Sequence, residues 1–96
     1  MILRERETPE GLLVSVCDPG LLGETFESEQ VSLTVNEEFY GGDPADEDSV
    51  VDSLQRAVVA NLVGVKAVEL AIKHGFVDEQ QVLELEGTLH AQMLRM

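Results

Sequence analysis

Between Ser49 and His74, apolar residues recur at a spacing that places them on one face of a helix. This stripe is formed by Leu54, Val58, Val65, Val68 and Ile72. Gly75 follows at a position where helices commonly end in a left-handed residue. Acidic residues near position 48 complement the positive end of a helix dipole. The pattern therefore predicts one helix over residues 49–74, more than a quarter of a chain of 96 residues.

Shorter apolar runs predict the remaining elements. Residues 2–7 and 12–17 have the composition of a β-hairpin, residues 31–35 alternate like a half-buried strand, and residues 88–96 resemble a final strand. Asp78 and Gln81 have the spacing of a capping box, which predicts a short second helix. We expect one α+β domain over residues 1–96. It would contain a small antiparallel or mixed sheet of about four strands, with the long helix packed across it.

Charge is the strongest signal in the composition. Nineteen acidic residues face six Lys and Arg, which gives a formal net charge of −13 at pH 7. The acids are scattered, as expected of a protein adapted to high internal salt, where ions screen its self-repulsion. A partner with a basic surface is the alternative interpretation. Direct binding to nucleic acid is disfavoured, because phosphate contacts need clustered Lys and Arg.

The sequence also indicates a compartment. No apolar run approaches the roughly 18 residues that a membrane-spanning helix needs, and the first residues lack the apolar stretch of a signal peptide. Cys17 is the only cysteine, so no disulfide can form within the chain. These features predict a cytoplasmic protein that spans no membrane.

Two features of the predicted helix bear on function. Asn61 falls within the apolar stripe, where its carboxamide either ties the helix to the sheet or lines a ligand pocket. Three apolar residues lie on the opposite side, and a helix that is apolar on two sides is usually covered on both. The second cover would be the C-terminal segment or another subunit. A homodimer would then form through Val59, Val63 and Leu70.

Four separated blocks occur in the order found in one known family. They are Cys17-Asp18 with Leu22-Gly23 and Phe26; Phe39-Tyr40-Gly41-Gly42; Asn61-Leu62-Val63-Gly64 with Ala67-Val68-Glu69-Leu70-Ala71; and His90-Ala91-Gln92. Through these blocks the chain resembles a family of small archaeal proteins catalogued as domain of unknown function 424. The resemblance implies an archaeal, cytoplasmic protein with a loose link to translation or RNA handling, and it supplies no activity. Glu24 stands where relatives often carry a basic residue, which weakens a phosphate-binding role for that loop.

The same blocks hold six polar side chains that the fold could bring together: Cys17, Asp18, Tyr40, Asn61, His90 and Gln92. Cys17, with His90 as base and Asn61 as orienting group, has the composition of a nucleophilic site. A lone cysteine at a strand end is more often a small core residue. A metal site of His90, Asp18 and Cys17 is a weaker alternative, because no pair of ligands has metal-binding spacing. No dinucleotide or phosphate-loop fingerprint is present, and we expect no cofactor.

Two functional hypotheses follow. The favoured one is a non-catalytic binding or adaptor module, linked to translation or a ribonucleoprotein through a protein partner. The alternative is a small enzyme with a site around Cys17, Tyr40, Asn61 and His90. Clustering of these four residues around a concave pocket would favour the enzyme, whereas a flat apolar patch would favour the adaptor.

Overall fold

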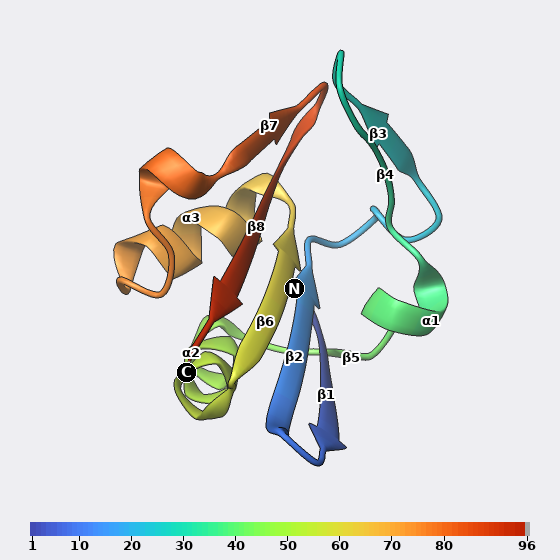
Figure 1. Ribbon diagram of the computed structural model, residues 1–96. Coiled ribbons are helices and arrows are strands. Elements are labelled where there is room, and N and C mark those ends of the chain that lie inside the picture. The colour runs from blue at the N-terminus through green and yellow to red at the C-terminus, as the bar shows by residue number, and fades with distance from the viewer. Residues whose placement is uncertain (96) are drawn as a thin grey trace.

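The computed structural model describes residues 1–95 and contains a mixed six-stranded sheet (Figure 1). The strand order across this sheet is β5-β1-β2-β6-β8-β7. The strands are β1 (Ile2–Thr8), β2 (Gly11–Cys17), β5 (Asp43–Pro44), β6 (Val59–Val63), β7 (Leu83–Leu85) and β8 (Thr88–Leu94). The predicted α+β class is therefore confirmed, but the main sheet is larger than the expected four strands.

The pairing confirms two sequence predictions. β1 and β2 form an antiparallel hairpin in which Thr8 lies opposite Gly11. β8 is the predicted final strand, and it pairs antiparallel with both β6 and β7. The parallel pair is β2 with β6, in which Val14 lies opposite Ala60. All elements between residues 18 and 58 belong to the crossover that joins these two central strands.

The predicted helix over residues 49–74 is wrong. The segment forms α2 (Glu47–Arg56), the central strand β6, and α3 (Val65–Lys73). β6 is only five residues long and contains apolar side chains on both of its faces. Periodicity cannot distinguish such a strand from a buried helix segment. Gly64, with a φ of 116°, makes the break between β6 and α3.

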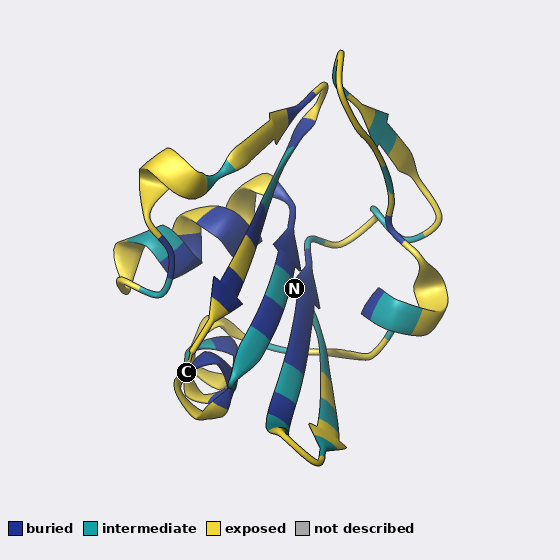
Figure 2. Cartoon of the chain, viewed as in Figure 1, coloured by how far each residue is buried: buried dark blue, intermediate teal, exposed yellow. Residues whose placement is uncertain are grey.

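Helices α2 and α3 cover one face of the sheet. Val50 and Leu54 of α2 and Val68 of α3 are fully buried in one cluster with residues of the central strands. Figure 2 shows buried residues on both helices and along the central strands. Burying a side chain of this kind stabilises a fold by about 1.5–3 kcal/mol. The sheet contributes Leu12, Val14, Val16, Ala60, Leu62, Ala91 and Met93 to the same cluster. No helix in residues 1–95 is long and apolar enough to cross a membrane.

The other face is covered at one end. The cover consists of α1 (Glu37–Tyr40) and a separate two-stranded sheet of β3 (Thr25–Glu27) and β4 (Ser32–Thr34). The strand predicted over residues 31–35 thus exists, but it pairs with β3 and does not join the main sheet. A second apolar cluster lies beneath this cover. Near the C-terminus, a 3-10 helix, η1 (Glu79–Gln81), takes the place of the predicted short helix, and Asp78 caps it.

The homodimer face predicted on the long helix does not exist as a helix surface. Val59 and Val63 belong to β6, whereas Leu70 lies on α3, which packs on the opposite side of the sheet. Val63 and Leu70 are both buried within their own chain. Asn61 likewise lies on a strand and is half-buried, so it is not the buried helical tie that the stripe suggested.

Candidate functional site

The six polar residues named from the sequence do not meet in one place. Cys17 lies opposite Val63, and Val63 lies opposite His90, on three successive strands. Cys17 and His90 are therefore two strand spacings apart, about 10 Å, which is too far for a hydrogen bond. Asn61 lies in a different row, with Gln92 opposite it on β8. The geometry does not assemble a nucleophile with its base.

Cys17 and Tyr40 belong to the apolar cluster beneath α1. Both side chains are buried, and Cys17 is completely so. Burial, with a contribution from the charge of Asp18, raises the pKa of the Cys17 thiol. Burial also raises the pKa of Tyr40 to about 12. A reactive cysteine requires the opposite shift, because the thiolate is the nucleophile. These two residues have the environment of core side chains.

Asp18 caps helix α3. Its Oδ2 accepts a hydrogen bond of 2.9 Å from the backbone N–H of Lys66, and its Oδ1 accepts one of 2.8 Å from that of Ala67. A Cβ on Gly64 would overlap the Asp18 carboxyl group. The sequence block with Asp18 and the block with Gly64 thus meet in one contact, at which the ends of β2 and β6 join the start of α3. The positive end of α3 already holds a carboxylate from the chain itself, which disfavours an external phosphate there.

His90 and Gln92 share a face of β8 but differ in exposure. Gln92 is exposed, whereas His90 is half-buried, and burial lowers the pKa of its imidazole. The ring is therefore neutral at pH 7. Within residues 1–95, no group of three or more His, Cys, Asp or Glu side chains is arranged to hold a metal ion.

On the side of the sheet away from α2 and α3, part of the surface is only partly buried. Strand register places two rows of side chains there, one through Ser15, Asn61 and Gln92 and the next through Leu13, Val59 and Leu94. Of these six residues, Ser15 is buried. α1 and the β3–β4 sheet cover only the end that contains Cys17. We call the remaining surface the open face. It consists of Leu13, Val59, Asn61, His90, Gln92 and Leu94, bordered by Arg4 and Arg6.

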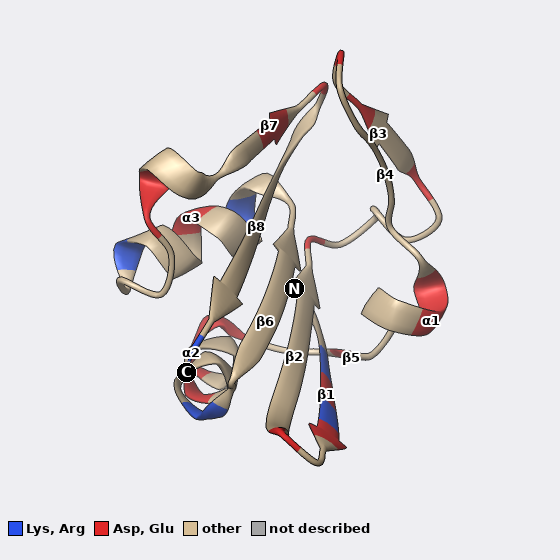
Figure 3. Ribbon diagram, viewed as in Figure 1, with Lys and Arg blue, Asp and Glu red and all other residues tan. Residues whose placement is uncertain are grey.

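The open face lacks acidic side chains. Strands β2, β6 and β8 contain no Asp, Glu, Lys or Arg along their length (Figure 3). On β1, the Glu5 side chain points to the side of the sheet that α2 covers, since it contacts Ser53 of that helix. Glu7, two residues further along the strand, points to the same side. In a chain with nineteen acids, this surface is an exception. A solvated sheet face normally carries charged side chains.

The two border arginines attach helix α1 to the sheet. Arg4 donates a 3.0 Å hydrogen bond to the carbonyl of Gly41, and Arg6 donates one of 2.7 Å to that of Glu38. The Arg6 guanidinium also lies 5.6 Å from the centre of the Phe39 ring, as in a cation–π contact. Their hydrogen-bond partners are backbone carbonyls, and the ion pairs found within residues 1–95 involve Arg56, so no carboxylate of the chain offsets the charge at this border.

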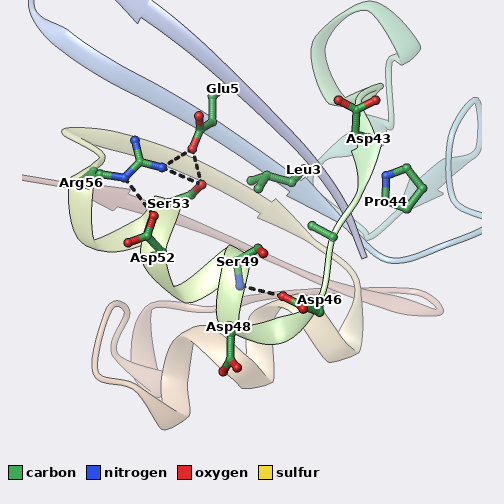
Figure 4. A pocket seen from close by; sticks show the side chains of 11 residues that line it. Leu3, Glu5, Asp43, Pro44, Asp46, Asp48, Ser49, Asp52, Ser53 and Arg56 are labelled. Carbon is green, nitrogen blue, oxygen red and sulfur yellow. Dashed lines mark hydrogen bonds and ion pairs between the residues drawn. The ribbon is translucent and has the colours of Figure 1, made fainter.

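A cleft of about 850 Å³ lies on the helix side, between β1, β5 and α2 (Figure 4). At one end, Arg56 pairs with Glu5 at 2.5 Å and with Asp52 at 3.1 Å. Hydrogen bonds from Ser53 and Arg56 lower the pKa of Glu5, so its carboxylate is charged at neutral pH. Asp46 accepts a hydrogen bond of 2.8 Å from the Ser49 N–H, as a helix cap does. None of the six polar residues lines this cleft.

Comparison with known proteins identifies the family. A family model described as protein of unknown function (DUF424) matches residues 5–96. The chain belongs to this family. The DUF424 resemblance found in the sequence blocks is thus confirmed, and the structure explains two of those blocks by the contact between Asp18 and Gly64.

The fold of this DUF424 protein is similar to that in the crystal structure of an uncharacterized conserved protein from Methanopyrus kandleri. The TM-score is 0.77, with 24% sequence identity over 99% of this chain and 92% of that chain. At this identity the likeness establishes a shared fold. A search of curated proteins finds no match.

Sequence reasoning missed the open face as a unit. Its signal was present, because residues 11–17, 59–63 and 88–94 lack charged side chains in a chain of which 26% is charged. The misassignment of residues 59–63 to a helix concealed that these three runs lie side by side. Asn61 and Gln92 were named as neighbours in a polar cluster, and they do lie opposite each other on that face.

Proposed function

We propose that this DUF424 protein is a non-catalytic binding module that holds a protein partner against its open face. Any role in translation or in a ribonucleoprotein would then run through this partner. The observation that supports the proposal is the uncharged face of β2, β6 and β8 on a chain whose net charge is −13.

The chemistry of the open face indicates the kind of partner. Interfaces between proteins have centres depleted in charge and borders that are polar. Here the centre contains Val59 and Asn61, and the border contains Arg4 and Arg6. The complementary surface is an uncharged patch of apolar and amide groups, with carboxylates placed opposite the two arginines. A basic patch would be repelled at this border.

The enzyme alternative draws no support from the site geometry. Cys17 has a raised pKa and stands about 10 Å from His90. Direct RNA binding also lacks support from the arrangement of the basic side chains. Arg4 and Arg6 place two positive charges at the border of the open face, and Arg95 instead donates a 2.7 Å hydrogen bond to the carbonyl of Gln55 on α2. These three side chains do not form the basic patch that phosphate contacts require.

The proposal is tested by placing one charge in the centre of the face. Tagged wild type, Val59→Glu and the control Val65→Glu are used to isolate partners from the native source at high salt. Val65 lies on α3 with 44% of its surface exposed, so its variant adds the same charge on the covered side of the sheet. Any partner found is purified, and its affinity for all three proteins is measured.

We expect one partner to bind wild type and Val65→Glu equally and to bind Val59→Glu at least about tenfold more weakly, a change of about 1.4 kcal/mol. Folding of each variant is verified by circular dichroism. A partner that binds Val59→Glu as tightly as wild type would show that the open face is not the binding surface.

A further inference from the structure

The two edges of the six-stranded sheet differ in how they resist an added strand. At one edge, β5 contains Pro44, and the adjacent part of β1 alternates Arg and Glu at residues 4–7. Proline and charged side chains are the usual protection of an exposed edge. At the other edge, β7 pairs only with residues 88–90 of β8. Residues 91–94 continue as an edge without proline, glycine or a charged side chain (Figure 1).

The backbone of β8 presents free groups at this edge. The Gly64 N–H donates to the Leu89 carbonyl at 2.9 Å, and the Arg95 N–H donates to the Val58 carbonyl at 2.8 Å. In an antiparallel pair, residues alternate between hydrogen-bonded and non-hydrogen-bonded positions. These two bonds therefore place Ala91 and Met93 at hydrogen-bonded positions, with their backbone N–H and C=O groups directed toward β6. Gln92 and Leu94 direct theirs outward, where no strand of residues 1–95 pairs with them.

We propose that this edge pairs with the same edge of a second copy of the chain. The two β8 strands would run antiparallel about a two-fold axis near Met93. Gln92 of each copy would lie opposite Leu94 of the other, and the outward N–H and C=O groups of both residues would be satisfied. The result is a dimer with one continuous sheet, formed by strand addition.

Charge permits a second copy at this edge, and the matching register of the two strands favours it. Two chains of net charge −13 repel each other wherever their acidic surfaces meet. The strand of residues 88–94 contains no acid, so two such strands can approach without opposing carboxylates. An added strand must also have its own outward groups at alternate positions. Gln92 and Leu94 provide them in matching register, and 67% of the Leu94 surface is exposed.

The pairing has a consequence for the open face. Residues directly opposite each other in a sheet point to the same side. The side chains of Gln92 and Leu94 belong to the open face, so the open faces of both copies would form one surface across the two-fold axis. If the open face binds a protein partner, as proposed above, the dimer would offer that partner a larger surface, and this consequence rests on the proposed function. The dimer itself does not depend on it.

Sedimentation of the purified full chain over a range of concentrations tests the dimer without any partner. We expect a reversible monomer–dimer equilibrium that strengthens when KCl is raised from about 0.1 M to about 1 M, because the Debye length falls from about 10 Å to about 3 Å. An interface held by ion pairs would weaken over the same range. A chain that stays monomeric under all these conditions overturns the proposal, and partner binding by that monomer would leave the proposed function standing.

Two variants locate the interface. Gln92→Pro removes an outward N–H while leaving the bonds to β6 in place, and proline is tolerated at such edge positions. Leu94→Lys adds a charge of the type that protects edges. Each should raise the dissociation constant at least about tenfold, whereas Val65→Lys, which adds the same charge on α3, should not. Dimers unaffected by both edge variants would contradict the proposed pairing.

Amide hydrogen exchange gives a residue-level readout. With rising protein concentration, exchange at Gln92 and Leu94 should slow, because their N–H groups become bonded only in the dimer. Ala91 and Met93 should be protected at every concentration, since their N–H groups are bonded to β6. Protection that does not alternate along β8 in this way would place the interface elsewhere.

Discussion

Asp18 occupies the space that a side chain on Gly64 would need. The Asp18 carboxylate accepts the N–H groups of Lys66 and Ala67, and it can approach them because Gly64 has no Cβ and adopts a φ of 116°. The end of β2, the end of β6 and the start of α3 are thereby held in one joint. Two segments separated by more than forty residues depend on each other at this point.

Substitution of this pair should destabilise the fold in a coupled manner. Asp18→Gly removes the cap of α3, a loss of about 0.5–2 kcal/mol for caps in general. Gly64→Ala adds backbone strain of about 1–3 kcal/mol and an overlap with the carboxyl group. The double variant should lose less than the sum, since the overlap disappears with the Asp18 side chain. Urea unfolding of all four proteins measures the coupling, and simple additivity would contradict the contact.

A second prediction concerns pH and His90. Burial lowers the pKa of this imidazole, so the folded state binds its proton less readily than the unfolded chain does. The stability that depends on a neutral ring is present above the ordinary histidine pKa and is lost as the pH falls below it. The free energy of unfolding should decline between about pH 7 and pH 5, less so in His90→Gln. Chemical unfolding at each pH gives the difference, and parallel profiles would argue against it.

The Glu5 carboxylate provides a pH effect in a lower range. Its pKa is lowered by the hydrogen bond from Ser53 and by Arg56. The contribution of Glu5 to stability is therefore present above the ordinary glutamate pKa and is lost as the pH falls through the lowered value. Glu5→Gln should be less stable than wild type at neutral pH, with the gap closing on acidification. Thermal melts across this range test the prediction, for which a constant gap would be the contrary result.

Salt should stabilise the monomer. Repulsion among nineteen carboxylates weakens when their charges are screened, and the Debye length falls about threefold between 0.1 M and 1 M salt. The melting temperature should therefore rise with KCl. The measurement is made on Leu94→Lys at low protein concentration, so that dimer formation does not contribute. A midpoint that does not move would remove the argument for salt adaptation.

A further prediction concerns Asn61, which lies on strand β6. A buried tie between a helix and the sheet would cost about 1–3 kcal/mol on replacement by leucine. Asn61 is instead half-buried on a strand of the open face. Asn61→Leu should therefore change the free energy of unfolding by less than about 1 kcal/mol. A larger loss in urea unfolding would show that the carboxamide has a structural partner.

The parts of the fold that sequence patterns predicted are those whose pattern is local. The hairpin of β1 and β2 follows from two apolar runs around a short turn, and β8 follows from its own composition. β6 could not be predicted in the same way, because both of its faces are apolar and it lies between two helical segments. Its strand conformation comes from β2 and β8 on either side.

The candidate site was only partly predictable for the same reason. Of the six polar residues in the family blocks, Asp18 caps helix α3 and Cys17 belongs to the apolar core. Asn61, His90 and Gln92 do share a face, which register alone could have shown had β6 been recognised. The absence of acids from that face becomes visible only when three distant runs are placed side by side.

The topology of β6 also bears on the rate at which the chain folds. This strand pairs Ala60 with Val14 on one side and with Met93 on the other, so both of its ladders close long loops. Closing such loops costs entropy before the contacts form, and pairings of this kind slow folding. The β1–β2 and β7–β8 hairpins need no such closure. We therefore expect the two hairpins to form early in folding. The pairing of residues 59–63 with β2 and β8 would come later and would limit the folding rate.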